Sequence, residues 1–195
     1  MIVGVVLAAG AATRMGKPKQ LMPYRGFPLL QHAVDAAEQS QLDRVVVVTG
    51  AFADDVEGDL HTSRAVTVRN PDFRRGNVSS LECGALAVPN AAAYVLLMGD
   101  HPNVRTEVID GLVSLWHDEQ PWGAVTAYRD KVAHPFLLSR AALEEAVRIG
   151  GPKLLWRLLV EDGIGRVVRV QVDHDAPVDV NTPEDYHDLI GDDTP

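Results

Sequence analysis

A loop of small residues follows the first apolar run of the chain and leads into three cations. The loop starts at Leu7–Gly10, and Arg14, Lys17 and Lys19 come shortly after it. Small side chains let backbone amides approach a ligand, and clustered cations bind anions, so this segment predicts a phosphate site. It matches neither a Walker loop, because Pro18 follows Lys17, nor the dinucleotide-binding glycine fingerprint.

The sequence around this loop predicts an α/β fold. Short apolar runs alternate with helix-like stretches, and several runs are apolar throughout, as in strands covered on both faces. We expect a single-domain three-layer α/β/α sandwich with a mostly parallel, Rossmann-like sheet over residues 1–195, and a frayed tail at 190–195. The expected strands are Ile2–Leu7, Val45–Thr49, Ala65–Val68, Tyr94–Met98 and Val167–Val172, and the expected helices are Pro28–Gln39, Val104–Trp116, Ala141–Ile149 and one that begins at Thr182–Pro183.

Composition narrows the class of ligand and the compartment. The chain has 195 residues, of which 46% are hydrophobic, and a net charge of −9, which favours a small-molecule substrate over nucleic acid. Its one cysteine, Cys83, excludes an internal disulfide, and we expect it to be a buried packing residue. The first residues lack the basic start of a signal peptide, and no apolar run approaches the ~20 residues of a membrane helix. We therefore expect a cytoplasmic protein with no membrane partner.

A carboxylate stands at the end of an apolar strand. Asp100 follows the run Tyr94–Gly99, and the carboxyl edge of a parallel sheet is where ligands of open α/β folds bind. Mg²⁺ takes oxygen ligands, commonly one or two carboxylates together with substrate phosphates. Asp100 is therefore the first candidate metal ligand, and the alternative is a turn-forming Asp before His101–Pro102.

Two further pairs of residues could contact a nucleotide. Thr49–Gly50 follows the second strand, and Ser79–Ser80 stands near an expected helix start. Their hydroxyl and backbone groups can bind a base or ribose, although a tight turn and a helix cap explain them equally well. Gly76 is expected to permit a close backbone approach or a positive φ.

The segment from Leu7 to Ala37 resembles the opening of the MobA/MocA-like nucleotidyltransferases, whose pattern is LxxGxxxRMGxxK. Further blocks extend the resemblance over almost the whole chain and make it most similar to the molybdenum cofactor cytidylyltransferases. These blocks are Asn70–Pro71, Gly76, Ser79–Leu81, Gly99–Pro102, Ala133–Pro135 and Asp179–Tyr186.

This resemblance implies a reaction and a division of roles. A phosphate oxygen of a pterin cofactor attacks the α-phosphate of CTP, which releases pyrophosphate. Arg14 and Lys19 are expected to contact the triphosphate and, with Asp100, to form the catalytic set. Asp179 or Asn181 is expected to join Asp100 at Mg²⁺, with Mn²⁺ as a possible substitute. The implied nucleotide-binding set is Leu7, Ala8, Ala9, Gly10, Arg14, Lys19, Thr49, Gly50, Gly76, Ser79, Ser80 and Asp100.

The resemblance says less about specificity. Ala9, where guanylyltransferases of the family have glycine, favours CTP over GTP. His134 matches a family block beside the acceptor and is the candidate acceptor-binding residue. Gly150–Lys153 departs from the family pattern, which leaves the acceptor open. The alternatives are a transferase of the same fold that uses GTP or another phosphorylated acceptor, and a non-catalytic nucleotide-binding module. A molybdoenzyme or chaperone is a possible protein partner.

Overall fold

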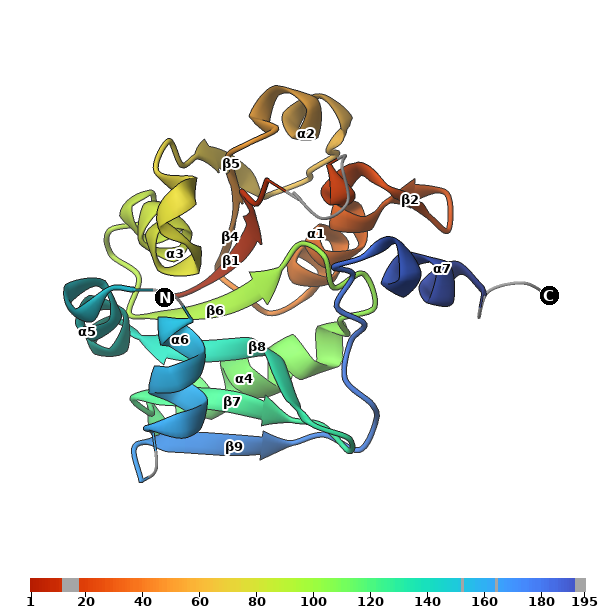
Figure 1. Ribbon diagram of the computed structural model, residues 1–195. Helices are drawn as coiled ribbons and strands as arrows, with labels where there is room; N and C mark the ends of the chain where they lie inside the picture. The colour runs from red at the N-terminus through yellow and green to blue at the C-terminus, as the bar shows by residue number, and fades with distance from the viewer. Residues whose placement is uncertain (12–17, 152, 164, 192–195) are drawn as a thin grey trace.

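The centre of the molecule is a seven-stranded sheet with the strand order β5-β4-β1-β6-β8-β7-β9 (Figure 1). The computed structural model describes residues 1–11, 18–151, 153–163 and 165–191. Neighbouring strands are parallel, except that β8 runs antiparallel to both β6 and β7. The strands are β1 (Ile2–Ala8), β4 (Arg44–Thr49), β5 (Val66–Arg69), β6 (Ala93–Met98), β7 (Gly123–Ala127), β8 (Val132–Ser139) and β9 (Val167–Gln171), and β2 (Pro23–Tyr24) and β3 (Phe27–Pro28) form a separate two-stranded ribbon.

Helices cover both faces of this sheet, because successive side chains of each strand point to opposite faces. In β1, Val6 belongs to the core under α1 and α4, whereas Val5 belongs to the core under α3 and α5. The first face carries α1 (Leu29–Gln39), α2 (Ala53–Asp59) and α4 (Thr106–Glu119), and the second carries α3 (Asn77–Leu86), α5 (Arg140–Ile149), α6 (Leu154–Trp156) and the π-helical turn η3 (Arg157–Glu161). The expected three-layer α/β/α sandwich with a mostly parallel sheet is confirmed.

The expected elements are present with small shifts of their ends. Each of the five expected strands corresponds to one of β1, β4, β5, β6 and β9. The expected helices correspond to α1, α4, α5 and α7 (Pro183–Gly191). At the start of α7, Thr182 Oγ1 accepts from the Asp185 amide at 3.2 Å, while Asp185 Oδ2 accepts from the Thr182 amide at 2.8 Å. These reciprocal bonds form a capping box at the expected helix start, and residues 190 and 191 belong to this helix instead of a frayed tail.

The sequence patterns missed β7 and β8. β7 consists of small residues, and β8 contains Pro135, which is rare inside a sheet because it cannot donate to the ladder. The register between the two strands shifts next to Val125, so Pro135 stands at an irregular position where no ladder bond is required. Its carbonyl instead accepts a hydrogen bond from Thr126 Oγ1 at 2.7 Å.

Two other properties follow from the described part of the chain. Among its helices, none combines the length and apolar character that crossing a membrane requires. Cys83, expected to be buried, is only partly so: its thiol donates to the Arg69 carbonyl at 3.6 Å. Burial raises the pKa of this thiol, and nearby Glu82 adds to the effect, so the reactive thiolate is disfavoured.

Candidate functional site

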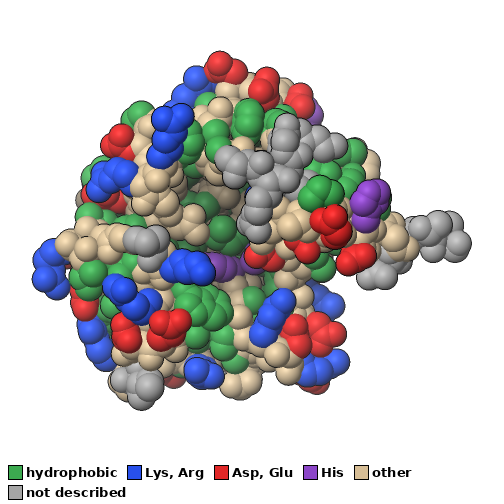
Figure 2. Space-filling view, in the orientation of Figure 1, with side chains coloured by type: hydrophobic (Ala, Val, Ile, Leu, Met, Phe, Trp, Pro, Cys, Tyr) green, Lys and Arg blue, Asp and Glu red, His purple; other side chains and the backbone are tan. Residues whose placement is uncertain are grey.

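A cavity of about 540 Å³ opens at the carboxyl edge of the sheet. In Figure 2 it is the hollow near the centre of the visible face, with a histidine at its floor. Residues from the ends of β1 and β6, from the start of α3 and from the segment before α7 contribute to its wall. The lining residues are Leu7, Ala9, Gly10, Lys19, Gln20, Phe73, Gly76, Asn77, Ser80, Met98, Asp100, His101, Lys131, Val132, Ala133, His134, Trp156, Pro177, Asp179 and Asn181.

The reversed direction of β8 explains why one cavity collects residues from so many elements. A parallel strand delivers its last residues to the carboxyl edge, whereas an antiparallel strand delivers its first residues to the same edge. Met98 therefore arrives from the end of β6, and Val132 and His134 arrive from the start of β8. The cavity is two-sided for this reason, with the first loop on one side and β8 on the other.

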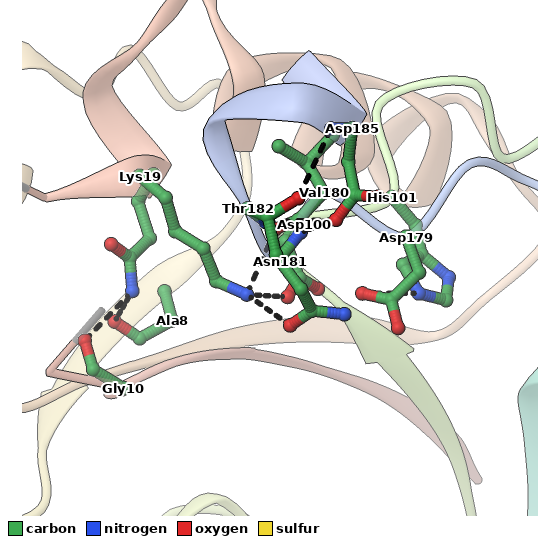
Figure 3. Close-up of polar contacts among 11 residues, drawn as sticks. Ala8, Gly10, Lys19, Asp100, His101, Asp179, Val180, Asn181, Thr182 and Asp185 are labelled. Atoms are coloured by element: carbon green, nitrogen blue, oxygen red, sulfur yellow. Dashed lines mark hydrogen bonds and ion pairs between the residues drawn. The ribbon is translucent and has the colours of Figure 1, made fainter. Parts of the chain in front are cut away.

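Gln20 holds the entrance of the first loop. It lies in the short 3₁₀ helix η1 (Lys19–Leu21), and its Nε2 donates to the carbonyls of Ala8 at 3.2 Å and Gly10 at 3.0 Å (Figure 3). Because Lys19 is its neighbour, the same turn fixes the cation relative to the loop backbone. Gln20 was not predicted from the sequence, since a glutamine after a lysine carries no distinctive signal by itself.

Two glycines let the neighbouring strands press against this loop. A Cβ on Gly50 would stand 2.7 Å from the Ala9 carbonyl oxygen, and a Cβ on Gly99 would stand 2.9 Å from that of Leu7. The Ala51 amide donates to the Ala9 carbonyl at 3.2 Å, and the Gly99 amide donates to Leu7 at 3.0 Å. The ends of β4 and β6 thus support the loop from behind.

Lys19 and Asp100 form a largely buried ion pair in the cavity. The ammonium contacts Asp100 Oδ2, the Val180 carbonyl at 3.0 Å and Asn181 Oδ1 at 3.1 Å (Figure 3). The side chains are 13% and 9% exposed. Three oxygens of different kinds therefore surround one positive charge, which shows that this donor set accommodates a cation.

Asp179 and His101 lie next to this pair. Asp179 Oδ1 is 3.6 Å from His101 Nε2, and one ligand atom each from Asp100, His101 and Asp179 lies within 4.8 Å of the other two. Burial tends to raise the pKa of Asp179, but His101, Asn181 and Lys19 together outweigh it and lower that pKa to about 2. The carboxylate is therefore anionic at neutral pH and suited to a cation. The sequence predicts His101 only as part of the turn after Asp100, so its place in this group comes from the structure.

Buried polar atoms without partners concentrate in this cavity. Within the described ranges, three buried side-chain atoms have no hydrogen-bond partner: Gln20 Oε1, Asp100 Oδ1 and His101 Nδ1. All three residues line the cavity. Such groups cost free energy when unpaired, so their concentration at one place indicates that a polar ligand binds there.

The β8 side of the cavity is aromatic. The His134 ring stacks on Phe136 with the centroids 4.1 Å apart, and Trp156, which is 39% exposed, lies 6.1 Å from the Phe136 ring. Burial, together with the neighbouring His101, lowers the pKa of His134 to about 3, so this imidazole is neutral at physiological pH. Lys131 adds a positive charge at the same side. A flat, anionic molecule matches this combination.

The structure gathers most of the predicted site residues and leaves some out. The predicted residues that line the cavity are Leu7, Ala9, Gly10, Lys19, Gly76, Ser80, Asp100, His134, Asp179 and Asn181. Gly76 has a φ of +93°, which confirms the expected backbone conformation. Arg14 lies outside the described residues.

Four predicted residues do not line the cavity, and each supports its neighbours. Thr49 is fully buried, and its hydroxyl donates to Glu57 in α2 at 2.8 Å. Ser79 Oγ donates to the Gly76 carbonyl at 2.9 Å, at the start of α3. Ala8 and Gly50 contribute through the backbone contacts described above.

The protein has a mostly parallel sheet, with a small-residue loop, a buried lysine–carboxylate pair and unpaired polar groups at the carboxyl edge. This combination is typical of α/β proteins whose ligands bind at the ends of the strands. Residues 4–167 match the family described as the MobA-like NTP transferase domain. The chain belongs to this family and is a nucleotidyltransferase.

Individual relatives agree with that assignment. The molybdenum cofactor cytidylyltransferase of Escherichia coli strain K12 is 25% identical over 185 residues, which cover 93% of this chain and 92% of that protein. Rv0371c from Mycobacterium tuberculosis H37Rv is 34% identical, with a TM-score of 0.87 and 97% of each chain covered. A second structure of Rv0371c, a complex with manganese, has a TM-score of 0.81 and 33% identity, and covers 97% of this chain and 98% of that one.

Proposed function

We propose that this protein transfers CMP from CTP to a phosphorylated molybdopterin-type acceptor and releases pyrophosphate. The observation that carries the proposal is the two-sided cavity, which has a loop, a lysine and a carboxylate on one side and an aromatic, cationic wall on the other. Such a cavity has separate places for a triphosphate and for a flat anionic acceptor. The similarity to the molybdenum cofactor cytidylyltransferase of E. coli supports this choice of acceptor.

In the proposed reaction, an acceptor phosphate oxygen forms a bond to the α-phosphorus of CTP. The bond between that phosphorus and the oxygen that bridges to the β-phosphate breaks, and pyrophosphate leaves with the electron pair. The protein's task is to align the two phosphates and to neutralise the developing charge. Lys19, and Arg14 by family resemblance, are assigned to the leaving pyrophosphate, and the loop Leu7–Gly10 to the nucleotide.

The donor set of the cavity fits a divalent cation. Asp100 Oδ1 is buried and unpaired among the described residues, and Asp179 is anionic. Asp100, with Asp179 or Asn181 as the second contact, would hold the ion, and a bound divalent cation supplies Lewis-acid stabilisation of phosphate charge. The family is divalent-metal dependent, and a relative was solved with manganese, so Mg²⁺ and Mn²⁺ are both candidates here.

CTP is proposed over GTP because Ala9 stands where guanylyltransferases of the family have glycine. A cytoplasmic location and a single domain over residues 1–195 remain predictions from the sequence. A molybdoenzyme or chaperone partner also remains a prediction. The second candidate is a transferase that uses GTP or another phosphorylated acceptor, and Gly150–Lys153, which departs from the family pattern, favours keeping it.

One assay tests both candidates. The protein is incubated with Mg²⁺ or Mn²⁺ and each of the four NTPs, without acceptor, with molybdopterin or with a sugar phosphate, and pyrophosphate release is followed. We expect release only with CTP and molybdopterin together. Release with GTP, or with a sugar phosphate as acceptor, would replace the first proposal by the second, and no release with any pair would favour a non-catalytic module.

A further inference from the structure

Asp100 presents its two carboxylate oxygens to different surroundings. Oδ2 pairs with the Lys19 ammonium, whereas Oδ1 is buried and has no hydrogen-bond partner within the described ranges. The residue is 7% exposed, so solvent does not compensate for the missing partner. The ion pair with Lys19 therefore accounts for only one of the two oxygens.

His101 and Asp179 stand beside this carboxylate on the side away from the Lys19 contacts (Figure 3). One ligand atom from each of the three residues lies within 4.8 Å of the others. His101 is 5% exposed, and its Nδ1 also lacks a partner in the described part of the chain. Ligand atoms around a six-coordinate cation with bonds of about 2.1 Å are roughly 3 Å apart, so the 3.6 Å between Asp179 Oδ1 and His101 Nε2 needs little adjustment.

We propose that His101 is a direct ligand of the divalent cation, together with Asp100 and Asp179, and that its nitrogen makes the site prefer Mn²⁺ over Mg²⁺. The inference rests on the proposed function only in placing the cation within the nucleotide cavity. Imidazole is a ligand for transition metals, whereas Mg²⁺ takes oxygen ligands and retains its waters. A site made of Asp100, Asp179 and Asn181 alone would offer no such preference.

The arrangement also lets the cation and Lys19 bind at the same time. The ammonium keeps Asp100 Oδ2, the backbone carbonyl of Val180 and the side-chain Oδ1 of Asn181, while the cation takes the other side of Asp100. If His101 merely paired with Asp179, Asp100 Oδ1 would stay without a partner among the residues that the structure describes. Direct ligation gives Asp100 Oδ1 the cation as its partner and makes His101 Nε2, the nitrogen that faces Asp179, a ligand, while Nδ1 carries the ring proton.

The test uses untagged protein without nucleotide or acceptor and Mn²⁺ as the probe. Pulsed electron paramagnetic resonance of bound Mn²⁺ is expected to show a directly bound ¹⁴N, and the signal should change to that of ¹⁵N in protein made with ¹⁵N-labelled histidine. This wild-type measurement needs no substitution, so it decides the proposal even where a variant fails to fold. Mn²⁺ bound with no histidine nitrogen coupling, or no detectable Mn²⁺ binding, would overturn it.

Variants identify the histidine. His101→Gln should abolish the nitrogen coupling and raise the Kd for Mn²⁺ at least about tenfold, because even partners that only orient a metal ligand cost roughly 10- to 100-fold when changed. The same variant should narrow the preference for Mn²⁺ over Mg²⁺ in competition.

His134→Gln is the matched control, since this ring lies 5.8 Å from His101 in the same cavity but outside the ligand set, and it should keep the coupling. Coupling that survives His101→Gln would contradict the proposal. Because CTP and acceptor are absent throughout, failure of the pyrophosphate assay leaves this measurement unaffected, and the two proposals fail separately.

Discussion

Two polar clusters of this protein differ in how completely their hydrogen-bonding groups are paired. In the first, the α1 joint, the Glu38 carboxylate accepts from the backbone amides of Ser63, Arg64 and Ala65 at 2.7 to 3.1 Å. The Arg64 guanidinium in turn donates to four carbonyls at and beyond the end of α1, those of Ala37, Glu38, Ser40 and Leu42.

The second cluster is the cavity floor, made of Gln20, Asp100 and His101. Each of these residues keeps one buried polar atom unpaired within the described ranges. The α1 joint satisfies its groups internally and therefore contributes to the stability of the fold. The cavity floor leaves groups unmatched, at a cost in stability, and a ligand can match them. Full pairing thus marks a structural cluster here, and incomplete pairing marks a functional one.

The largest expected effect is at the cavity floor. Asp100→Asn keeps the size of the side chain and one oxygen but removes the charge that a divalent cation and Lys19 both require. We expect turnover to fall by at least about 100-fold, comparable to the loss of a preorganised electrostatic group in other active sites, while the fold is kept. Steady-state kinetics measures the loss of turnover. Thermal melting with and without CTP and metal checks that the variant is still folded.

Asp118→Asn is the control for Asp100→Asn, because it makes the same chemical change on an exposed carboxylate of α4. Wild-type turnover in a folded Asp100→Asn protein would reduce Asp100 to a turn residue and remove the contrast between the clusters.

Lys19→Ala comes next. It should cost about 2–4 kcal/mol of transition-state stabilisation, since it removes one donor to the charge that develops on pyrophosphate, and Arg14→Ala should fall in the same range. Lys19→Met retains the apolar stem, so equal losses in both Lys19 variants would assign the effect to the ammonium. The measurement is kcat/KM for CTP, and unchanged values would exclude the assigned role.

Glu38→Gln tests the α1 joint and should affect stability without affecting turnover. Replacing the charged acceptor should lower the free energy of unfolding by about 1–3 kcal/mol in urea titrations, with Glu119→Gln, an exposed change on α4, as control. A loss of kcat in the folded variant would contradict the structural assignment.

The stability effect of Glu38 should depend on pH. Burial raises its pKa, but the hydrogen bonds from residues 63 to 65 outweigh burial and hold the pKa below the ordinary value of 4.5. The folded state thus favours the carboxylate, and its stabilisation is complete above pH 4.5 and lost as the pH falls through the lower, folded value. The gap between wild type and Glu38→Gln should therefore narrow below pH 4.5.

The smallest effect is expected at the β8 side of the cavity. His134→Ala should raise the KM for the acceptor several-fold, about 1 kcal/mol for one ring contact, and leave CTP affinity unchanged. Acceptor saturation curves measure the KM for the acceptor, and equilibrium titration measures the affinity for CTP. Weaker CTP binding instead would move His134 to the nucleotide side and show that the cavity is less clearly two-sided than its lining indicates.

Sequence patterns were sufficient to predict the strands that are apolar throughout and the loop that follows the first of these strands. β1, β4 and β6 could be predicted because they are covered on both faces, which forces nearly every residue to be apolar. β7 and β8 could not be predicted in this way. β7 consists of small residues, and β8 tolerates Pro135 only because the register between β7 and β8 is irregular there. Half of the residues that line the cavity were predicted from the strand ends and the family resemblance, whereas Gln20, His101, Lys131 and Trp156 were not.

The sequence by itself determined the class of this protein. Local spacing is enough to predict a small-residue loop after an apolar strand, an acid at the end of another strand and the start of the final helix. Each of these features involves only residues that are neighbours in the chain. The tertiary structure decided which of these groups meet. Lys19, Asp100 and Asn181 are separated by about 80 residues at each step and touch only because β1 and β6 pair side by side and the segment before α7 crosses their ends. The pairing of polar atoms, which distinguishes the cavity floor from the α1 joint, depends on three-dimensional contacts and is absent from any one-dimensional pattern.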